Sequence, residues 1–150
     1  MAERSADRPK LRQTSRSLPI ALLRAREKVM GPIREMLAES DINEQKWRVL
    51  RVLEESGPLE LTSLAREACL LLPSLTRMIQ AMIAEDLVGR ETDPADRRRS
   101  IISITDAGRQ LILGHAEESN AIFQRLERRF GRENLEQLLD LLEQLRQTDY

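Results

Sequence analysis

The chain has almost none of the residues from which catalytic and metal sites are usually built. Its 150 residues include one cysteine, Cys69, and one histidine, His115. A single cysteine excludes an internal disulfide and a zinc site made of several thiolates, and a single histidine excludes a histidine-rich metal site. There is no glycine-rich phosphate-binding loop and no serine in a Gly-x-Ser-x-Gly setting. The sequence therefore predicts no enzyme, no bound metal and no cofactor.

Aromatic residues and long apolar runs are also scarce. Only 3% of the residues are aromatic, whereas 33% are charged, which is typical of amphipathic helices with charged outer faces. No apolar run approaches the length of a membrane span, and the N-terminal residues lack the apolar core of a signal peptide. We expect a soluble, helix-rich, cytoplasmic protein with no membrane partner.

The net charge of −1 does not point to nucleic acid, so the distribution of charge matters more than its sum. Residues 1–16 carry five Lys or Arg against two Asp or Glu, and Arg97, Arg98 and Arg99 form a second basic group. The C-terminal stretch is acidic on balance. A near-neutral total can therefore conceal a basic face.

Helical periodicity begins after a polar N-terminal stretch. Residues 1–16 lack periodicity and are predicted to be a flexible arm, while the pattern over 17–38 predicts a helix that Gly31–Pro32 kinks or interrupts. Asn43 is a suitable N-cap for a second helix. Four of its residues are expected to be buried: Trp47, Leu50, Val52 and Leu53.

Two short helices follow, separated by a tight turn. The first has Leu61, Leu64, Ala65 and Ala68 on its apolar side, and Pro73 suits the first turn of the second. The second helix is expected to bury Leu75, Ile79, Met82 and Ile83 and to turn Ser74, Thr76, Arg77 and Gln80 outward. Such a pair is what reading a DNA major groove requires, although an ordinary amphipathic surface helix would show the same pattern.

The next segment favours the DNA reading. Residues 87–92 and 100–104 are β-prone, and the segment between them includes Asp93-Pro94-Ala95-Asp96, whose residue types strongly favour a turn. A β-hairpin is therefore predicted. Arg97, Arg98 and Arg99 at its tip are placed to contact phosphates. Alternatively they form a solvated charge run paired with Asp93 and Asp96, or Asp96 braces one arginine through a bidentate pair.

The apolar pattern in the C-terminal third of the chain indicates a dimer. Thr105 should cap one long helix, and Gly131 should end it before a final helix with a leucine stripe. Nothing in the preceding segments obviously covers that stripe, so a second copy of the chain is the natural partner. The expected interface residues are Leu18, Leu22, Phe123, Leu135, Leu138, Leu142 and Leu145.

The run Asp93–Arg98, followed by Ile102–Gly108, resembles the wing signature of the MarR family of transcriptional regulators. The resemblance implies a mainly α (α+β) fold with a single domain over 17–150. A winged helix-turn-helix would span about 43–105, and helices at 17–38 and 105–147 would form a dimerisation layer. It also implies a homodimer on a pseudo-palindromic double-stranded operator. Segments 20–27, 45–53 and 68–76 are similar to family members that repress aromatic-compound catabolic operons and respond to a phenolic acid.

Carried onto this chain, the resemblance assigns DNA contacts to Ser74, Thr76, Arg77, Gln80 and Arg98, with Arg97 and Arg99 as neighbours and Asp96 as the bracing residue. The effector, a small phenolic or aromatic carboxylate, needs cations, a ring and polar groups. The candidates are Ser17, Arg24, Arg26, Trp47, Arg51, Arg66 and Cys69, each of which has a purely structural role as its alternative.

Other readings stay open. A MarR-type protein can instead control efflux or an oxidative stress response, and a winged helix can serve protein contacts without binding DNA. Family members that sense oxidants do so through a cysteine on the first helix, where this chain has none. Cys69 is expected to be buried, as free cysteines usually are, and His115 to lie at a surface or interface.

Overall fold

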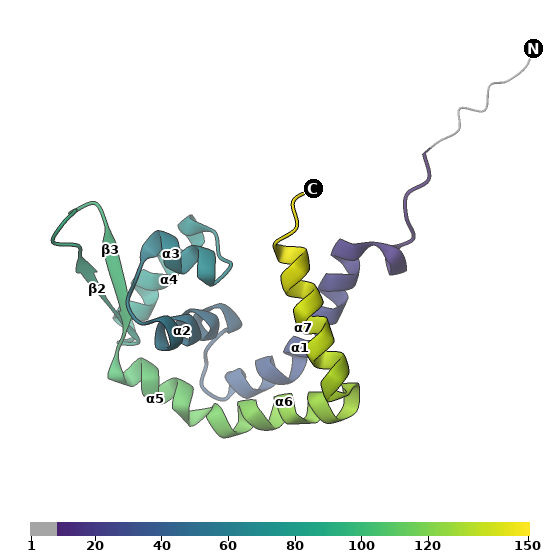
Figure 1. Cartoon of the computed structure of the whole chain (residues 1–150). Coiled ribbons are helices and arrows are strands. Elements are labelled where there is room, and N and C mark those ends of the chain that lie inside the picture. The colour runs from purple at the N-terminus through teal and green to yellow at the C-terminus, as the bar shows by residue number, and fades with distance from the viewer. Residues whose placement is uncertain (1–8) are drawn as a thin grey trace, which may run out of the picture. The chain divides into compact units, whose positions relative to one another are not determined.

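The computed structural model describes residues 9–150, and Figure 1 shows their elements in order. The chain divides into two compact units, Met1–Pro32 and Ile33–Tyr150. The described residues form mainly helices and one small sheet, so the predicted mainly α class is confirmed. The helices are α1 (Leu18–Ala38), α2 (Glu44–Ser56), α3 (Leu61–Glu67), α4 (Leu72–Ala84), α5 (Asp106–Gly114), α6 (Ala116–Phe130) and α7 (Arg132–Arg146), and the strands are β1 (Leu59–Glu60), β2 (Val88–Thr92) and β3 (Ser100–Ile104).

The first unit consists of the N-terminal stretch and most of α1. Residues 1–8 of the predicted arm lie outside the described residues, and a single 3₁₀ turn, η1 (Thr14–Arg16), precedes α1. Pro32 lies inside α1, which continues to Ala38, so the predicted interruption at Gly31–Pro32 does not end the helix. Proline removes only one hydrogen bond from the ladder, and the buried residues Ile33, Met36 and Leu37 hold the turns that follow.

Helix α2 lies at the centre of the second unit. The Asn43 side chain accepts a hydrogen bond from the Lys46 amide at 2.8 Å, as the predicted N-cap requires. The helix packs against α3, α5 and β3, and this explains why Val49 is buried in addition to Trp47, Leu50 and Leu53. Val52, which was expected to be buried, is half-buried.

The sheet has the antiparallel order β1-β3-β2. Val88 pairs with Ile104 and Thr92 with Ser100, so β2 and β3 form the predicted hairpin. The two-residue strand β1 was not predicted, because a segment that short shows no periodicity. Leu59 in β1 pairs with the fully buried Ile102, which fixes the hairpin to the start of α3.

The predicted long helix after Thr105 is in fact two helices. Thr105 caps α5, with its Oγ1 accepting from the Gly108 amide at 3.0 Å, but α5 ends at Gly114 and α6 begins at Ala116. His115 separates them. Its side chain is 6% exposed and hydrogen-bonded through Nε2 to Ser40 Oγ at 2.6 Å, so the expectation of a surface or interface histidine was wrong. The hydrogen bond ties the residue at the break to the turn after α1.

Gly131, with φ +98°, separates α6 from α7 as predicted. No residue of α7 is buried, and Leu138, Leu139, Leu141, Leu142 and Leu145 are exposed along it. Near its end Arg146 donates two hydrogen bonds to Glu143, and these hold the pKa of Glu143 below its usual value. Within the described residues, no helix is both long and apolar enough to cross a bilayer.

Candidate nucleic-acid interface and effector site

Helix α4 buries one face and presents a polar face. Leu75, Ile79 and Met82 are fully buried. Arg77 and Gln80 are exposed, while Ser74 and Thr76 are half-buried. Thr76 donates its hydroxyl proton to the Leu72 carbonyl at 2.9 Å, which leaves its oxygen able to accept a hydrogen bond. Ile83, expected in the buried stripe, is 38% exposed, because the neighbouring Met82 takes the buried position in the last turn of the helix.

The turn between α3 and α4 is a Schellman motif. The Leu70 amide donates to the Ala65 carbonyl at 2.9 Å and the Cys69 amide to the Arg66 carbonyl at 3.2 Å. Cys69 has φ +53° and is exposed, so its expected burial was wrong. The motif gives the buried position to Ala68 and turns the left-handed residue outward.

Arg48 connects α2 to this turn, a role that the sequence did not reveal. Its Nη1 donates to the Ala68 carbonyl at 2.8 Å. Because the partner is a backbone oxygen twenty residues away, no pattern of side chains could have indicated it. Through this hydrogen bond α2, which also carries Trp47, contacts the helix-turn-helix directly.

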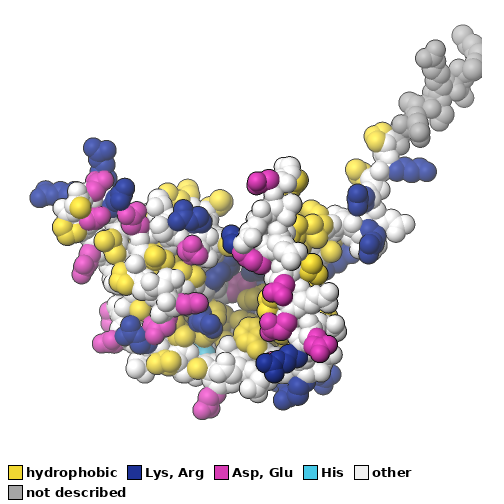
Figure 2. Space-filling model, in the orientation of Figure 1, with side chains coloured by type: hydrophobic (Ala, Val, Ile, Leu, Met, Phe, Trp, Pro, Cys, Tyr) yellow, Lys and Arg dark blue, Asp and Glu magenta, His cyan; other side chains and the backbone are white. Residues whose placement is uncertain are grey.

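The hairpin tip is ordered by its aspartates. Asp93 Oδ1 accepts from the Ala95 amide at 2.9 Å, and Asp96 Oδ1 accepts from the Arg98 amide at 3.0 Å. Asp96 Oδ2 lies 3.7 Å from Arg99 Nε, so the bidentate pair anticipated for Asp96 does not form. Asp96 instead fixes the backbone that carries the arginines. Figure 2 shows basic and acidic side chains together at this tip.

The three wing arginines are not equivalent. Arg99 donates from Nη1 to Glu60 Oε1 at 3.0 Å and thereby ties the hairpin to the start of α3. Arg97 and Arg98 are exposed and make no side-chain ion pair among residues 9–150. Arg98 and Arg99 line a hollow of about 220 Å³ with Arg90, a residue for which the sequence indicated no role. Glu60, the partner of Arg99, lines the same hollow, so Arg90 and Arg98 supply its arginine charge that Glu60 does not pair.

A second cavity, also of about 220 Å³, lies against α2, α5 and α6. Its lining consists of Trp47, Arg51, Ile112, Ala116, Ser119 and Asn120. The Arg51 guanidinium carbon is 6.0 Å from the centroid of the Trp47 ring, and the Ser119 side chain is buried. An aromatic ring, a cation and hydrogen-bonding groups thus face one space, which suits an aromatic acid.

Two of the seven predicted effector residues, Trp47 and Arg51, line this cavity. Ser17, Arg24 and Arg26 belong to the first unit, where Arg24 Nη2 is 3.5 Å from Thr14 Oγ1 and Arg26 Nη1 is 3.8 Å from Glu27. Arg66 and Cys69 are exposed on the helix-turn-helix and do not line it. Ser119 and Asn120 were missed because the break at His115 sets their orientation.

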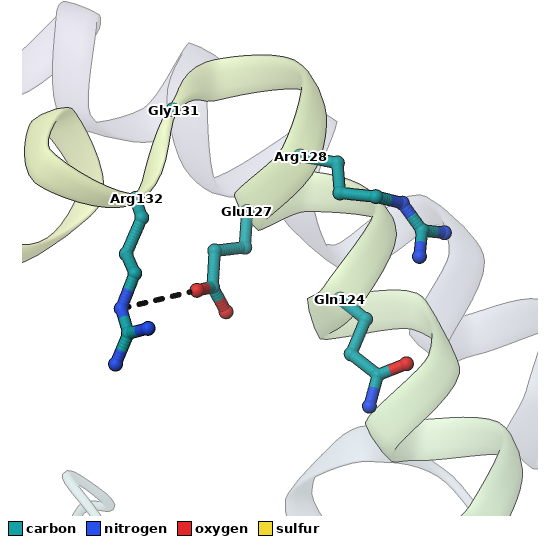
Figure 3. Close-up of a pocket in the computed structure, with 5 residues that line it drawn as sticks. All are labelled: Gln124, Glu127, Arg128, Gly131 and Arg132. Carbon is teal, nitrogen blue, oxygen red and sulfur yellow. Dashed lines mark ion pairs between the residues drawn. The ribbon is translucent and has the colours of Figure 1, made fainter.

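A further hollow lies at the corner between α6 and α7. It is lined by Gln124, Glu127, Arg128, Gly131 and Arg132. Figure 3 shows Arg132 turned toward Glu127, 3.4 Å away, while Arg128 extends away from this pair. No aromatic or aliphatic side chain lines it, so it is a poorer match for an aromatic ligand.

Comparison with known proteins agrees with this geometry. The family model of the MarR family matches residues 42–100, which covers the helix-turn-helix and most of the hairpin. The homoprotocatechuate degradative operon repressor of Escherichia coli is 37% identical over 128 residues, covering 85% of this chain and 86% of the relative. The chain belongs to the MarR family.

Solved structures of MarR-like proteins extend the likeness over most of the chain. NadR in complex with 4-hydroxyphenylacetate has a TM-score of 0.81 and 33% identity, covering 94% of this chain and all of that one. CouR, a transcriptional repressor bound to a 23-mer DNA duplex, has a TM-score of 0.78 and 28% identity, covering 93% and 99%. The predicted family is confirmed, and this MarR family protein is a transcriptional regulator.

Proposed function

We propose that this MarR family member is a homodimeric, cytoplasmic repressor of an aromatic-compound catabolic operon. It binds a pseudo-palindromic operator and releases it when a phenolic acid binds. The cavity over α2 carries the proposal, because it places Trp47 and Arg51 in the same compact unit as the helix-turn-helix. The homoprotocatechuate repressor and the 4-hydroxyphenylacetate complex of NadR support an effector of this class.

In the proposed complex α4 enters the major groove. Arg77 and Gln80 are exposed on it and would contact base edges, and Ser74 and Thr76, which are half-buried, are the other proposed DNA contacts. Arg97 and Arg98 would contact phosphates from the wing, and Arg99 would hold the wing in place through Glu60. The similar fold of CouR, a repressor bound to a DNA duplex, supports DNA as the partner.

Arg77→Ala and Arg98→Ala should weaken operator binding in different ways. Arg77→Ala should cost about 1–3 kcal/mol on the operator and little on random duplex, because it removes a base contact. Arg98→Ala should weaken binding to both duplexes and lower the slope of log K against log salt by about 1, because it removes a phosphate contact. Mobility-shift titrations at several salt concentrations measure both effects. Parent-like binding by both variants would refute these assignments.

In the cavity, the effector's carboxylate would pair with Arg51 and its ring would pack on Trp47. Ser119 and Asn120 are placed to hydrogen-bond a phenolic hydroxyl or a carboxylate oxygen. We further propose that the next positions to test as effector contacts are Ser17, which precedes α1, Arg24 and Arg26 of α1, and Arg66 and Cys69 of the helix-turn-helix. The mechanism is a population shift, in which operator and effector select different spacings of the two α4 helices.

Arg51→Gln should weaken binding of 4-hydroxyphenylacetate by about tenfold or more, because a charge-assisted hydrogen bond contributes about 1.5–3 kcal/mol. Operator affinity without the acid should stay unchanged. Isothermal titration calorimetry gives the first value and a mobility shift the second. Arg125→Gln is a matched control, since Arg125 is exposed on α6 and does not line the cavity. Equal affinities for Arg51→Gln and the parent would rule out this site.

A further inference from the structure

We propose that Glu39, His115 and Glu118 form a binding site for a divalent transition-metal ion, with Zn²⁺ as the best-matched ion. One potential ligand atom from each residue lies within 4.8 Å of those of the other two. This imidazole–carboxylate cluster borders the effector cavity without being part of its lining. The proposal does not depend on the proposed function.

Three separate segments build the cluster. Glu39 lies in the turn after α1, where the Ser40 amide donates to the Leu37 carbonyl at 3.1 Å. His115 is the single residue between α5 and α6, and Glu118 follows in the first turn of α6. His115 and Glu118 are three residues apart and therefore share one face of the helix start. The backbone thus fixes all three positions.

The two carboxylates have no cation to neutralise them. Among the described residues, neither Glu39 nor Glu118 makes a hydrogen bond or ion pair, whereas nearby Glu44 pairs with Arg34 at 3.2 Å. Two negative groups at this separation repel each other, and a bound divalent cation would turn that repulsion into attraction. The cluster therefore has the charge that a metal ion needs.

The imidazole is already held in place. His115 is 6% exposed, its Nε2 is hydrogen-bonded to Ser40 Oγ at 2.6 Å, and its ring lies edge-on to Trp47 with centroids 5.8 Å apart. A metal-bound histidine usually hydrogen-bonds an oxygen through its other ring nitrogen, and Ser40 supplies such an oxygen. Little entropy is lost on binding when the ligand is ordered beforehand.

The three ligand groups favour Zn²⁺ over Mg²⁺ and Ca²⁺. One imidazole and two carboxylates suit Zn²⁺, which takes nitrogen and oxygen ligands at about 2.0–2.2 Å and tetrahedral geometry, with water as the fourth ligand. Mg²⁺ and Ca²⁺ prefer oxygen ligands alone. Closing the cluster from its present spacing requires movement of Glu39 and Glu118, and both side chains are exposed and can rotate freely.

The test is a zinc titration of chelator-treated full-length protein. Trp47 is the sole tryptophan and touches the His115 ring, so its fluorescence should change as zinc binds. Competition with a chromophoric zinc chelator should give one zinc per chain. Glu118→Gln and Glu39→Gln should each weaken binding by about tenfold or more, by analogy with the loss of other groups that support a bound metal.

Two controls separate this site from adventitious binding. Glu117→Gln removes the adjacent exposed carboxylate of α6, which is outside the cluster, and should bind zinc like the parent. Cys69→Ser removes the only thiol and should also leave binding unchanged. Both glutamate variants of the cluster lie on the surface and leave the core intact. Absence of zinc binding, or binding that Glu118→Gln and Glu39→Gln leave unaltered, would overturn the proposal.

Discussion

Gly108→Ala should destabilise the protein by about 3 kcal/mol, the cost of forcing an extra methyl group into a filled site. Gly108 lies in the first turn of α5 and is buried. A Cβ there would lie 2.3 Å from the Leu87 carbonyl oxygen and 2.9 Å from Ile104 Cγ1. The Leu87 carbonyl cannot move aside easily, because it accepts a hydrogen bond from the Thr105 amide at 3.1 Å.

Helix propensity predicts the opposite sign, since alanine is favoured over glycine by about 1 kcal/mol within a helix. Gly114 provides the matched control because a Cβ there meets nothing within 4 Å. Gly114→Ala should be neutral or stabilising by up to about 1 kcal/mol. Urea unfolding at one fixed protein concentration measures both variants. Similar midpoints for Gly108→Ala and the parent would show that α5 and Leu87 are not packed as described.

Combining Leu138→Glu with Leu142→Glu should convert the proposed dimer to monomer. Both leucines lie on α7, 41% and 37% exposed, on a helix with no buried residue. In a dimer the substitutions would bury four unpaired carboxylates around one interface, at a cost of several kcal/mol. Operator affinity should then fall by about 100-fold or more, because the two half-sites are no longer bound by two helix-turn-helix units joined in one dimer.

Light scattering after size-exclusion chromatography measures the mass, and a mobility shift measures operator affinity. Gln137→Glu with Gln144→Glu adds the same charge to the other face of α7 and should leave both values unchanged. A dimeric leucine variant would place the interface elsewhere. A monomeric variant that binds the operator like the parent would show that one chain suffices for recognition.

The elements that local chemistry determines could be predicted from the sequence. The caps at Asn43 and Thr105 need only a side-chain oxygen and the next turn of backbone. The hairpin needs only its turn residues and two β-prone flanks, and the observed pairing of β2 with β3 agrees with that prediction. The wing and α4 therefore lie where the sequence placed them.

Features that depend on distant partners could not be predicted. The Glu60–Arg99 pair joins residues thirty-nine positions apart, and its existence depends on β1, which is too short to recognise. Ser119 and Asn120 line the cavity from α6, whose separate start after His115 no local pattern in the sequence indicated. Cys69 is exposed because the Schellman turn, not its hydrophobicity, sets its orientation.

The single-residue break at His115 also has a mechanical consequence. Helix α5 packs on α2, which contacts the helix-turn-helix, whereas α6 packs on α7, which carries the exposed leucines. The break at His115 therefore lies between the DNA-binding part and the proposed dimerisation part. A continuous helix would resist bending along its whole length, whereas two helices joined at one residue can change their angle through that residue's backbone torsions. A change in the angle between α5 and α6 would therefore have to pass through His115, whose side chain is held by Ser40 and Trp47.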